Sequence, residues 1–134
     1  MDIDTSALFA PIVINGHTVK NRLSVAPMTR ISAAQDGRAT ETMTRYYERF
    51  ARGGFGTVIT EGIYTDQSFS QGYLHQPGMT DETQANARKP VVSGIKAHGA
   101  LAIAQMLHAG ALSQGNRFRD TTVGPSPVSQ RANR

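Results

Sequence analysis

The 134-residue sequence contains no cysteine, which excludes disulfides, thiolate metal sites and a cysteine nucleophile within the chain. It also contains no apolar run near the roughly 20 residues that a membrane-spanning helix needs. The N-terminal residues 1–5, MDIDT, lack the basic and then apolar order of a signal peptide. We therefore expect a cytoplasmic protein without membrane contact, and we assign no residue to a metal site.

Lysine is scarce, because the net charge of +4 rests on 11 arginines and only 3 lysines. The arginines are scattered, without a basic run or interleaved aromatic side chains, so we expect no nucleic-acid binding. The glycine-rich phosphate turns G-x-G-x-x-G and G-x-x-x-x-G-K-[ST] are missing as well. Their absence argues against a doubly wound nucleotide-binding fold.

A sequence pattern for a β-hairpin lies near the N-terminus, and three patterns for strands come after it along the chain. Asn15-Gly16, flanked by alternating apolar residues, predicts a β-hairpin over 12–19, because Asn-Gly accepts positive φ at both central turn positions. Short apolar runs predict buried strands at about 23–26, 55–60 and 100–107. Long loops are expected from about residue 63 to 78 and from 108 to the C-terminus.

Two helices are expected between these strands. The first has one apolar face that includes Tyr46 and Tyr47, an N-cap at Thr40, and a C-terminal stop at Gly53-Gly54. The second begins near residue 80 and runs towards residue 99. Pro90 interrupts it, so this helix either kinks there or breaks and restarts with the proline in its first turn.

The alternation of strands and helices predicts an α/β fold with a parallel sheet and right-handed crossovers. Polar residues follow each strand, which favours a (β/α)8 barrel, since such barrels carry their chemistry on the loops after the strands. A barrel needs roughly 250 residues. We therefore expect a segment of an incomplete barrel, completed by a second chain or by missing sequence, because an open three-stranded sheet leaves an exposed apolar edge.

From residues 26–30, APMTR, onward, the sequence resembles the old yellow enzyme family, the NADH:flavin oxidoreductases that act as FMN-dependent ene reductases. The order and spacing of several short motifs carry the resemblance over nearly the whole chain: RGGFG at 52–56, TEG at 60–62, QPG at 76–78, QMLHAG at 105–110 and GPS at 124–126. The resemblance implies that 1–134 is the N-terminal segment of a single FMN-binding (β/α)8 TIM-barrel domain. The hairpin would be a lid on its N-terminal mouth.

The resemblance also implies a set of cofactor-binding residues at the strand ends. They are Ala26, Pro27, Met28 and Thr29 along the flavin, Gly62 beneath the isoalloxazine ring, and Gln105 at the pyrimidine edge. The residue types suit these roles, because a neutral amide both donates and accepts hydrogen bonds. A threonine hydroxyl that donates to the flavin favours its reduction. Plainer readings stay open: Gln105 bonded to backbone, Thr29 capping a turn, and Gly62 as a strand-end glycine.

Three further polar residues receive structural interpretations. Glu61 is expected to be an ion-pair partner or a backbone acceptor, because a carboxylate beside the flavin would oppose its reduction. His108 is expected to brace its loop, and Arg30 is considered for the substrate mouth but not favoured. No catalytic residue is assigned, since the substrate-orienting pair, the proton-donating tyrosine and the phosphate site of the family lie beyond this segment. Alone, the segment is expected to be inactive.

The resemblance implies that NADPH or NADH reduces FMN and that the flavin passes hydride to an activated alkene such as an enone. An alternative is another branch with the same barrel, such as dienoyl-CoA reductases or amine dehydrogenases. A second alternative is a non-catalytic fragment that complements another chain. Homo-oligomerisation is left open.

Overall fold

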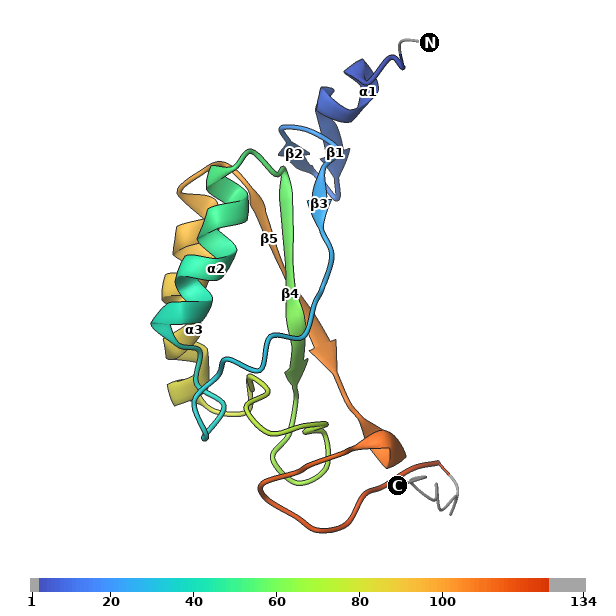
Figure 1. The fold of residues 1–134 in the computed structure, drawn as a ribbon, viewed down its shortest axis with the longest axis vertical. Helices are drawn as coiled ribbons and strands as arrows, with labels where there is room; N and C mark the ends of the chain where they lie inside the picture. Colours follow the sequence, from blue (N-terminus) through green and yellow to red (C-terminus); the bar gives the residue numbers. More distant parts are fainter. Residues whose placement is uncertain (1–2, 126–134) are drawn as a thin grey trace.

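The computed structural model describes residues 3–125, so part of the motif at 124–126 lies outside the described residues. Figure 1 shows an N-terminal hairpin, a three-stranded sheet and two long helices. In chain order the elements are α1 Ser6–Phe9, β1 Ile12–Ile14, β2 His17–Val19, β3 Ser24–Val25, α2 Glu41–Arg52, β4 Thr57–Tyr64, α3 Glu82–Lys96, β5 Leu101–Leu107 and the 3₁₀ turn η1 Gly110–Leu112. The short α1 and η1 were not predicted.

The predicted hairpin is present as the antiparallel pair of β1 and β2. Asn15 and Gly16 both have positive φ, at 46° and 79°, as the turn requires. The hairpin lies at the end of the sheet where the strands begin, opposite the loops that follow them (Figure 1). Its role as a lid on a barrel mouth stays a prediction.

The strands β3, β4 and β5 form a parallel sheet in that order, as predicted. Helices α2 and α3 lie side by side on one face of this sheet (Figure 1). Buried apolar side chains from both layers form the core between them: Val25, Met43, Val58, Val91 and Ile95. The fold is therefore a succession of β-α units with helices on one side only, which is the local architecture of a (β/α)8 barrel.

The helix ends follow the sequence signals. Thr40 Oγ1 accepts a hydrogen bond from the Met43 N–H at 3.4 Å, so Thr40 caps α2 as predicted. Asp81 caps α3 in the same way, by accepting from the Gln84 N–H at 2.8 Å. Helix α3 runs through Pro90 without a break, so the alternative of a restart at Pro90 is wrong. Pro90 is exposed, which leaves solvent to satisfy the carbonyl that its missing N–H would have met.

The predicted bounds of the second strand are wrong at both ends. Strand β4 begins at Thr57 rather than 55 and continues to Tyr64 rather than 60, so the loop expected from Ile63 starts later. Thr60 and Glu61 resembled a polar strand end, yet both are buried inside the strand. Their polar groups have partners within the protein, which local sequence does not reveal.

Candidate functional site

The geometry of the site starts from an irregularity in β4. Ile59 pairs with Ile103 and Gly62 pairs with Gln105, so β4 advances three residues while β5 advances two. This one-residue excess is a β-bulge. Paired residues share a face, and so do Ile103 and Gln105, which stand two residues apart. The bulge therefore places Gly62 on the same face as Ile59, which is the face away from the helices.

Gly62 occupies a place where no side chain fits. A Cβ atom there would lie 2.7 Å from Leu107 Cδ1 and 3.1 Å from Leu107 Cβ. Part of the demand for glycine thus comes from Leu107 itself, independently of any bound ring. Gly62 itself is buried, and the Leu107 side chain lies against the place that a Cβ would take.

Gln105 pairs with Gly62 in the parallel register and lies on the same face of the sheet, away from the helices. We call this the open face. Its side chain is exposed. Within residues 3–125, no hydrogen-bond partner is found for its amide, so nothing supports the alternative that Gln105 bonds to neighbouring backbone. The amide is free to donate to and accept from a ligand beside Gly62.

The segment from Ala26 to Thr29 follows β3 and reaches the same end of the sheet. Pro27 is half-buried, and Ala26, Met28 and Thr29 are exposed. The next residue anchors the segment to β4, because the Arg30 N–H donates to Glu61 Oε2 at 3.0 Å. Since Glu61 directly precedes Gly62, this bond holds the segment after β3 against β4, on the helix side of the strand and one residue before Gly62.

Tyr73, which sequence reasoning missed, joins this region from the loop after β4. Burial raises the pKa of Tyr73, and the nearby Thr29 side chain lowers it by less. Its hydroxyl is buried and has no hydrogen-bond partner among the described residues. Tyr73 and Leu107 line a hollow of about 340 Å³, together with Gly72, His108, Ala109, Leu112 and Gln114. A buried hydroxyl without a partner is a feature that a bound polar group could satisfy.

His108 braces its own loop, as predicted. Its Nδ1 accepts a hydrogen bond from the Gly110 N–H at 3.0 Å, and its Nε2 lies 3.6 Å from Asp66 Oδ2. The His108 ring therefore links the loop after β5 to the loop after β4.

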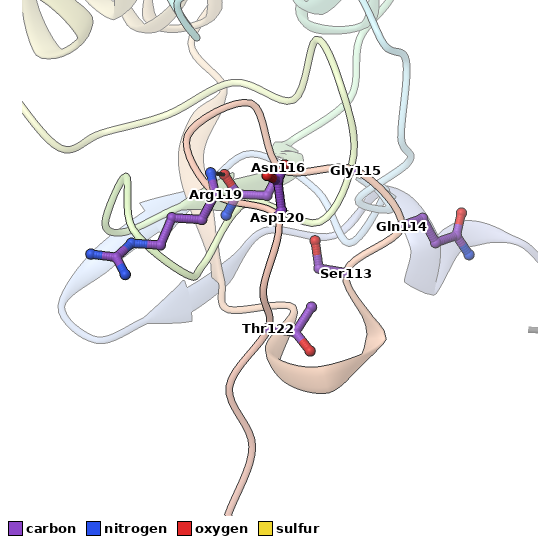
Figure 2. A pocket seen from close by; sticks show the side chains of 7 residues that line it. All are labelled: Ser113, Gln114, Gly115, Asn116, Arg119, Asp120 and Thr122. Atoms are coloured by element: carbon purple, nitrogen blue, oxygen red, sulfur yellow. Dashed lines mark hydrogen bonds between the residues drawn. The ribbon is translucent and has the colours of Figure 1, made fainter. Parts of the chain in front are cut away.

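The chain beyond β5 forms a second hollow, of about 260 Å³, lined by the side chains in Figure 2. Buried Gln71 anchors this part: its carbonyl accepts from Ser113 Oγ at 2.7 Å, and its Oε1 accepts from the Arg117 N–H at 2.7 Å. Asn116 adds a bond from Nδ2 to the Ser68 carbonyl at 3.2 Å. Nothing in the local sequence marks Gln71 as this anchor.

Glu61 lies on the helix side of β4 and is fully buried. Its Oε1 accepts a hydrogen bond from the Tyr47 hydroxyl at 3.3 Å, and its own N–H donates to that hydroxyl at 2.8 Å. Burial raises the pKa of Glu61, while the Arg30 N–H and the Tyr47 hydroxyl lower it. The prediction that Glu61 is a backbone acceptor is confirmed. Tyr47 is a core residue as predicted, with a polar role that its apolar helix face did not indicate.

Two arginines, Arg30 and Arg88, lie near the buried Glu61 side chain. The Arg30 guanidinium lies 4.9 Å from the centre of the Tyr46 ring, over α2. Arg88 is buried, and its Nε donates to the Gly78 carbonyl at 3.3 Å. Burial lowers the pKa of Arg88, and the nearby Tyr47 and Glu61 raise it by less.

Comparison with known proteins decides the family. Residues 7–134 match the NADH:flavin oxidoreductase / NADH oxidase family. The chain belongs to this family. The family model is named for FMN, which agrees with the cofactor that the resemblance implied.

Relatives and solved structures agree with this assignment. The NADH:fumarate oxidoreductase of Klebsiella pneumoniae (strain 342) is 33% identical over 98 residues, which cover 73% of this chain and 10% of that protein. The structure of the old yellow enzyme homologue from Zymomonas mobilis has a TM-score of 0.72 and 34% identity, with 78% of this chain and 29% of that chain covered. A 2-naphthoyl-CoA reductase structure has a TM-score of 0.78 and 32% identity, with 81% and 16% covered.

The chain spans less than a third of the length of each of these proteins. Its fold is the N-terminal part of an old yellow enzyme (β/α)8 barrel, as predicted. Within residues 3–125, no helix has the length and apolar character to cross a membrane.

Proposed function

We propose that the chain supplies the first three strands of an FMN-dependent oxidoreductase that passes hydride from NAD(P)H, through the flavin, to an activated C=C bond. The observation that carries this proposal is the Gly62–Gln105 pair on the open face of the sheet, with an amide that has no partner among the described residues. The bond from the Arg30 N–H to Glu61 supports the proposal, because it holds the segment after β3 against β4 next to Gly62.

Each of the proposed site residues has a separate role in binding the cofactor. The segment Ala26, Pro27, Met28 and Thr29 lies along the ring, with Thr29 as a hydroxyl donor that tunes the redox potential. Gly62 leaves the space for the ring, and Gln105 bonds its pyrimidine edge. Bound FMN supplies the hydride chemistry, and the chain supplies binding, orientation and electrostatics.

An activated alkene is the proposed substrate class. The Klebsiella relative is named for fumarate, whose C=C bond is activated by two carboxyl groups. The second candidate is a reductase of CoA thioesters, because one similar structure is that of a 2-naphthoyl-CoA reductase. The two candidates share the flavin site and differ in the substrate.

One anaerobic experiment tests this proposal. The chain purified together with the remainder of its barrel is expected to show visible flavin absorbance, to lose it when NADPH or NADH is added, and to regain it when an enone is added without oxygen. Recovery with an aryl-CoA thioester, and none with an enone, would select the second candidate. Absent flavin absorbance, or absorbance that neither nicotinamide bleaches, would overturn both and leave the chain as a non-catalytic complement of a second chain.

A matched pair of glutamine variants tests the cofactor site. Gln105→Leu is expected to weaken FMN binding by about 5- to 30-fold, the loss that corresponds to one or two hydrogen bonds of about 1 kcal/mol each. Gln67→Leu is the control, because Gln67 is also exposed but belongs to the loop after β4 and bonds Asp81 at 3.5 Å. Equal FMN affinity of the two variants would remove Gln105 from the site.

A further inference from the structure

Glu61 is a fully buried carboxylate on the side of β4 that faces the helices, away from the proposed flavin site. Burying a charge is costly unless hydrogen bonds and opposite charge compensate for it. A glutamine or an apolar side chain would fill the same place at lower cost. The contacts of the two carboxylate oxygens show what the carboxylate accomplishes there.

The first oxygen fixes the side chain itself. The β-bulge removes the Glu61 N–H from the regular ladder, and the Tyr47 hydroxyl accepts it at 2.8 Å. The same hydroxyl donates its proton to Glu61 Oε1 at 3.3 Å. This reciprocal pair holds the carboxylate in one orientation, and Tyr47 is itself fixed in the core of α2.

The second oxygen, Oε2, bonds the segment that follows β3. Residues 26–32 belong to no strand or helix, so the Arg30 N–H has no ladder partner. It donates to Glu61 Oε2 at 3.0 Å instead. Because this N–H belongs to the peptide that joins Thr29 to Arg30, the bond fixes the backbone directly after Thr29. The Arg30 side chain over Tyr46 holds the same residue a second time.

We propose that Glu61 is a positioning residue, whose carboxylate holds the Thr29–Arg30 peptide so that the Thr29 hydroxyl is presented to the flavin. The inference rests on the proposed function for its consequence at the flavin, and on the structure alone for the bond to Arg30. It gives a role to a buried acceptor that points away from the site next to Gly62.

Positioning and direct electrostatics predict opposite changes in the flavin potential. If the Glu61 charge acted directly, its removal would make the flavin easier to reduce. If Glu61 acts through the Thr29 donor, loss of the hydrogen bond makes the flavin harder to reduce, as Thr29→Ala is expected to do. Glu61→Gln keeps a carbonyl acceptor for the Arg30 N–H, so it should stay close to the wild type, whereas Glu61→Ala should not.

The first measurement is amide hydrogen exchange at Arg30 in the chain without flavin. Glu61→Ala is expected to speed this exchange by about tenfold or more, the factor that corresponds to about 1.4 kcal/mol, and Glu61→Gln should restore most of the protection. Tyr47→Phe, which removes only the hydroxyl, should give a change in the same direction and serves if Glu61→Ala does not fold. Glu48→Ala is the control, since its partly exposed carboxylate bonds His98 at 3.2 Å.

The second measurement is the midpoint potential of the FMN-loaded protein. Glu61→Ala, or Tyr47→Phe in its place, is expected to lower the potential in the wild-type background and to add nothing in the Thr29→Ala background. Additive effects, a raised potential, or Arg30 exchange that these variants leave unchanged would overturn the proposal. If the wild type takes up no FMN, the proposed function fails, and the positioning role then stands or falls on the Arg30 exchange.

Discussion

The two faces of the β3-β4-β5 sheet differ in how their polar side chains are satisfied. On the helix side, Glu61 satisfies both of its oxygens within the protein. At the strand end, Gln84 of α3 donates to the Tyr64 hydroxyl at 2.7 Å and to the Asp36 carbonyl at 2.8 Å. On the open side, Gln105 has an amide without a partner among the described residues. The helix side is thus a finished protein core, whereas we propose that a ligand and further strands complete the open side.

The sharpest way to test this difference is the same substitution on each side. Ile95→Ala removes a fully buried side chain from the core and is expected to lower the free energy of unfolding by about 2–5 kcal/mol. Ile103→Ala removes a half-buried side chain from the open face and should cost clearly less. Denaturant unfolding of both variants makes the measurement, and equal losses would mean that the open face is packed as tightly as the core.

Gly62 separates packing from cofactor binding on the open side. Gly62→Ala is expected to lower the free energy of unfolding by about 1–3 kcal/mol, because its Cβ meets Leu107. Adding Leu107→Ala should recover much of this stability by removing the clash. FMN affinity should stay low in the double variant if the ring needs the space above Gly62. Recovery of both together would show that only Leu107 demands a glycine there.

Thr29→Ala tests the polar edge of the open side. The variant is expected to make bound flavin harder to reduce by roughly 30–65 mV, since a hydrogen bond to a charged group contributes about 1.5–3 kcal/mol. A redox titration of the loaded protein measures the shift, with the exposed Thr42→Ala on α2 as the control. An unchanged or raised potential would contradict the role of Thr29.

The smallest expected effect is the pH dependence of stability that arises from Glu61 on the helix side of the sheet. Burial raises the pKa of Glu61 in the folded state above its ordinary value of 4.5, so the folded protein binds this proton more tightly than the unfolded chain. The associated stability is present in full below the unfolded pKa and is lost as pH rises through the folded pKa. As pH rises from acid to neutral, the free energy of unfolding of Glu61→Gln should therefore increase relative to that of the wild type. Glu41→Gln, at an exposed position, should show no such trend.

The sequence predicted most of what depends on local patterns. The Asn15-Gly16 turn, the Thr40 cap and the order of the parallel strands all follow from short-range chemistry, and the structure confirms them. The prediction failed in β4, where Thr60 and Glu61 suggested a strand end. The partners of Glu61, Tyr47 and Arg30, are distant in the sequence, and no local pattern encodes the bulge that turns Glu61 towards Tyr47.

The candidate site divides in the same way. The family resemblance assigns Gly62 and Gln105 to one cofactor site, and the parallel register places them side by side. Tyr73 and the Glu61–Arg30 bond were missed, because each depends on a loop that crosses another strand end. Such contacts between loops follow from tertiary structure alone.

The most direct test of the account is a crystal structure of the protein loaded with FMN. The account predicts the flavin ring against Gly62, with the Gln105 amide bonded to its pyrimidine edge and the Thr29 hydroxyl facing its carbonyl. A flavin bound elsewhere, or a Gln105 amide that still faces solvent beside the bound ring, would contradict it.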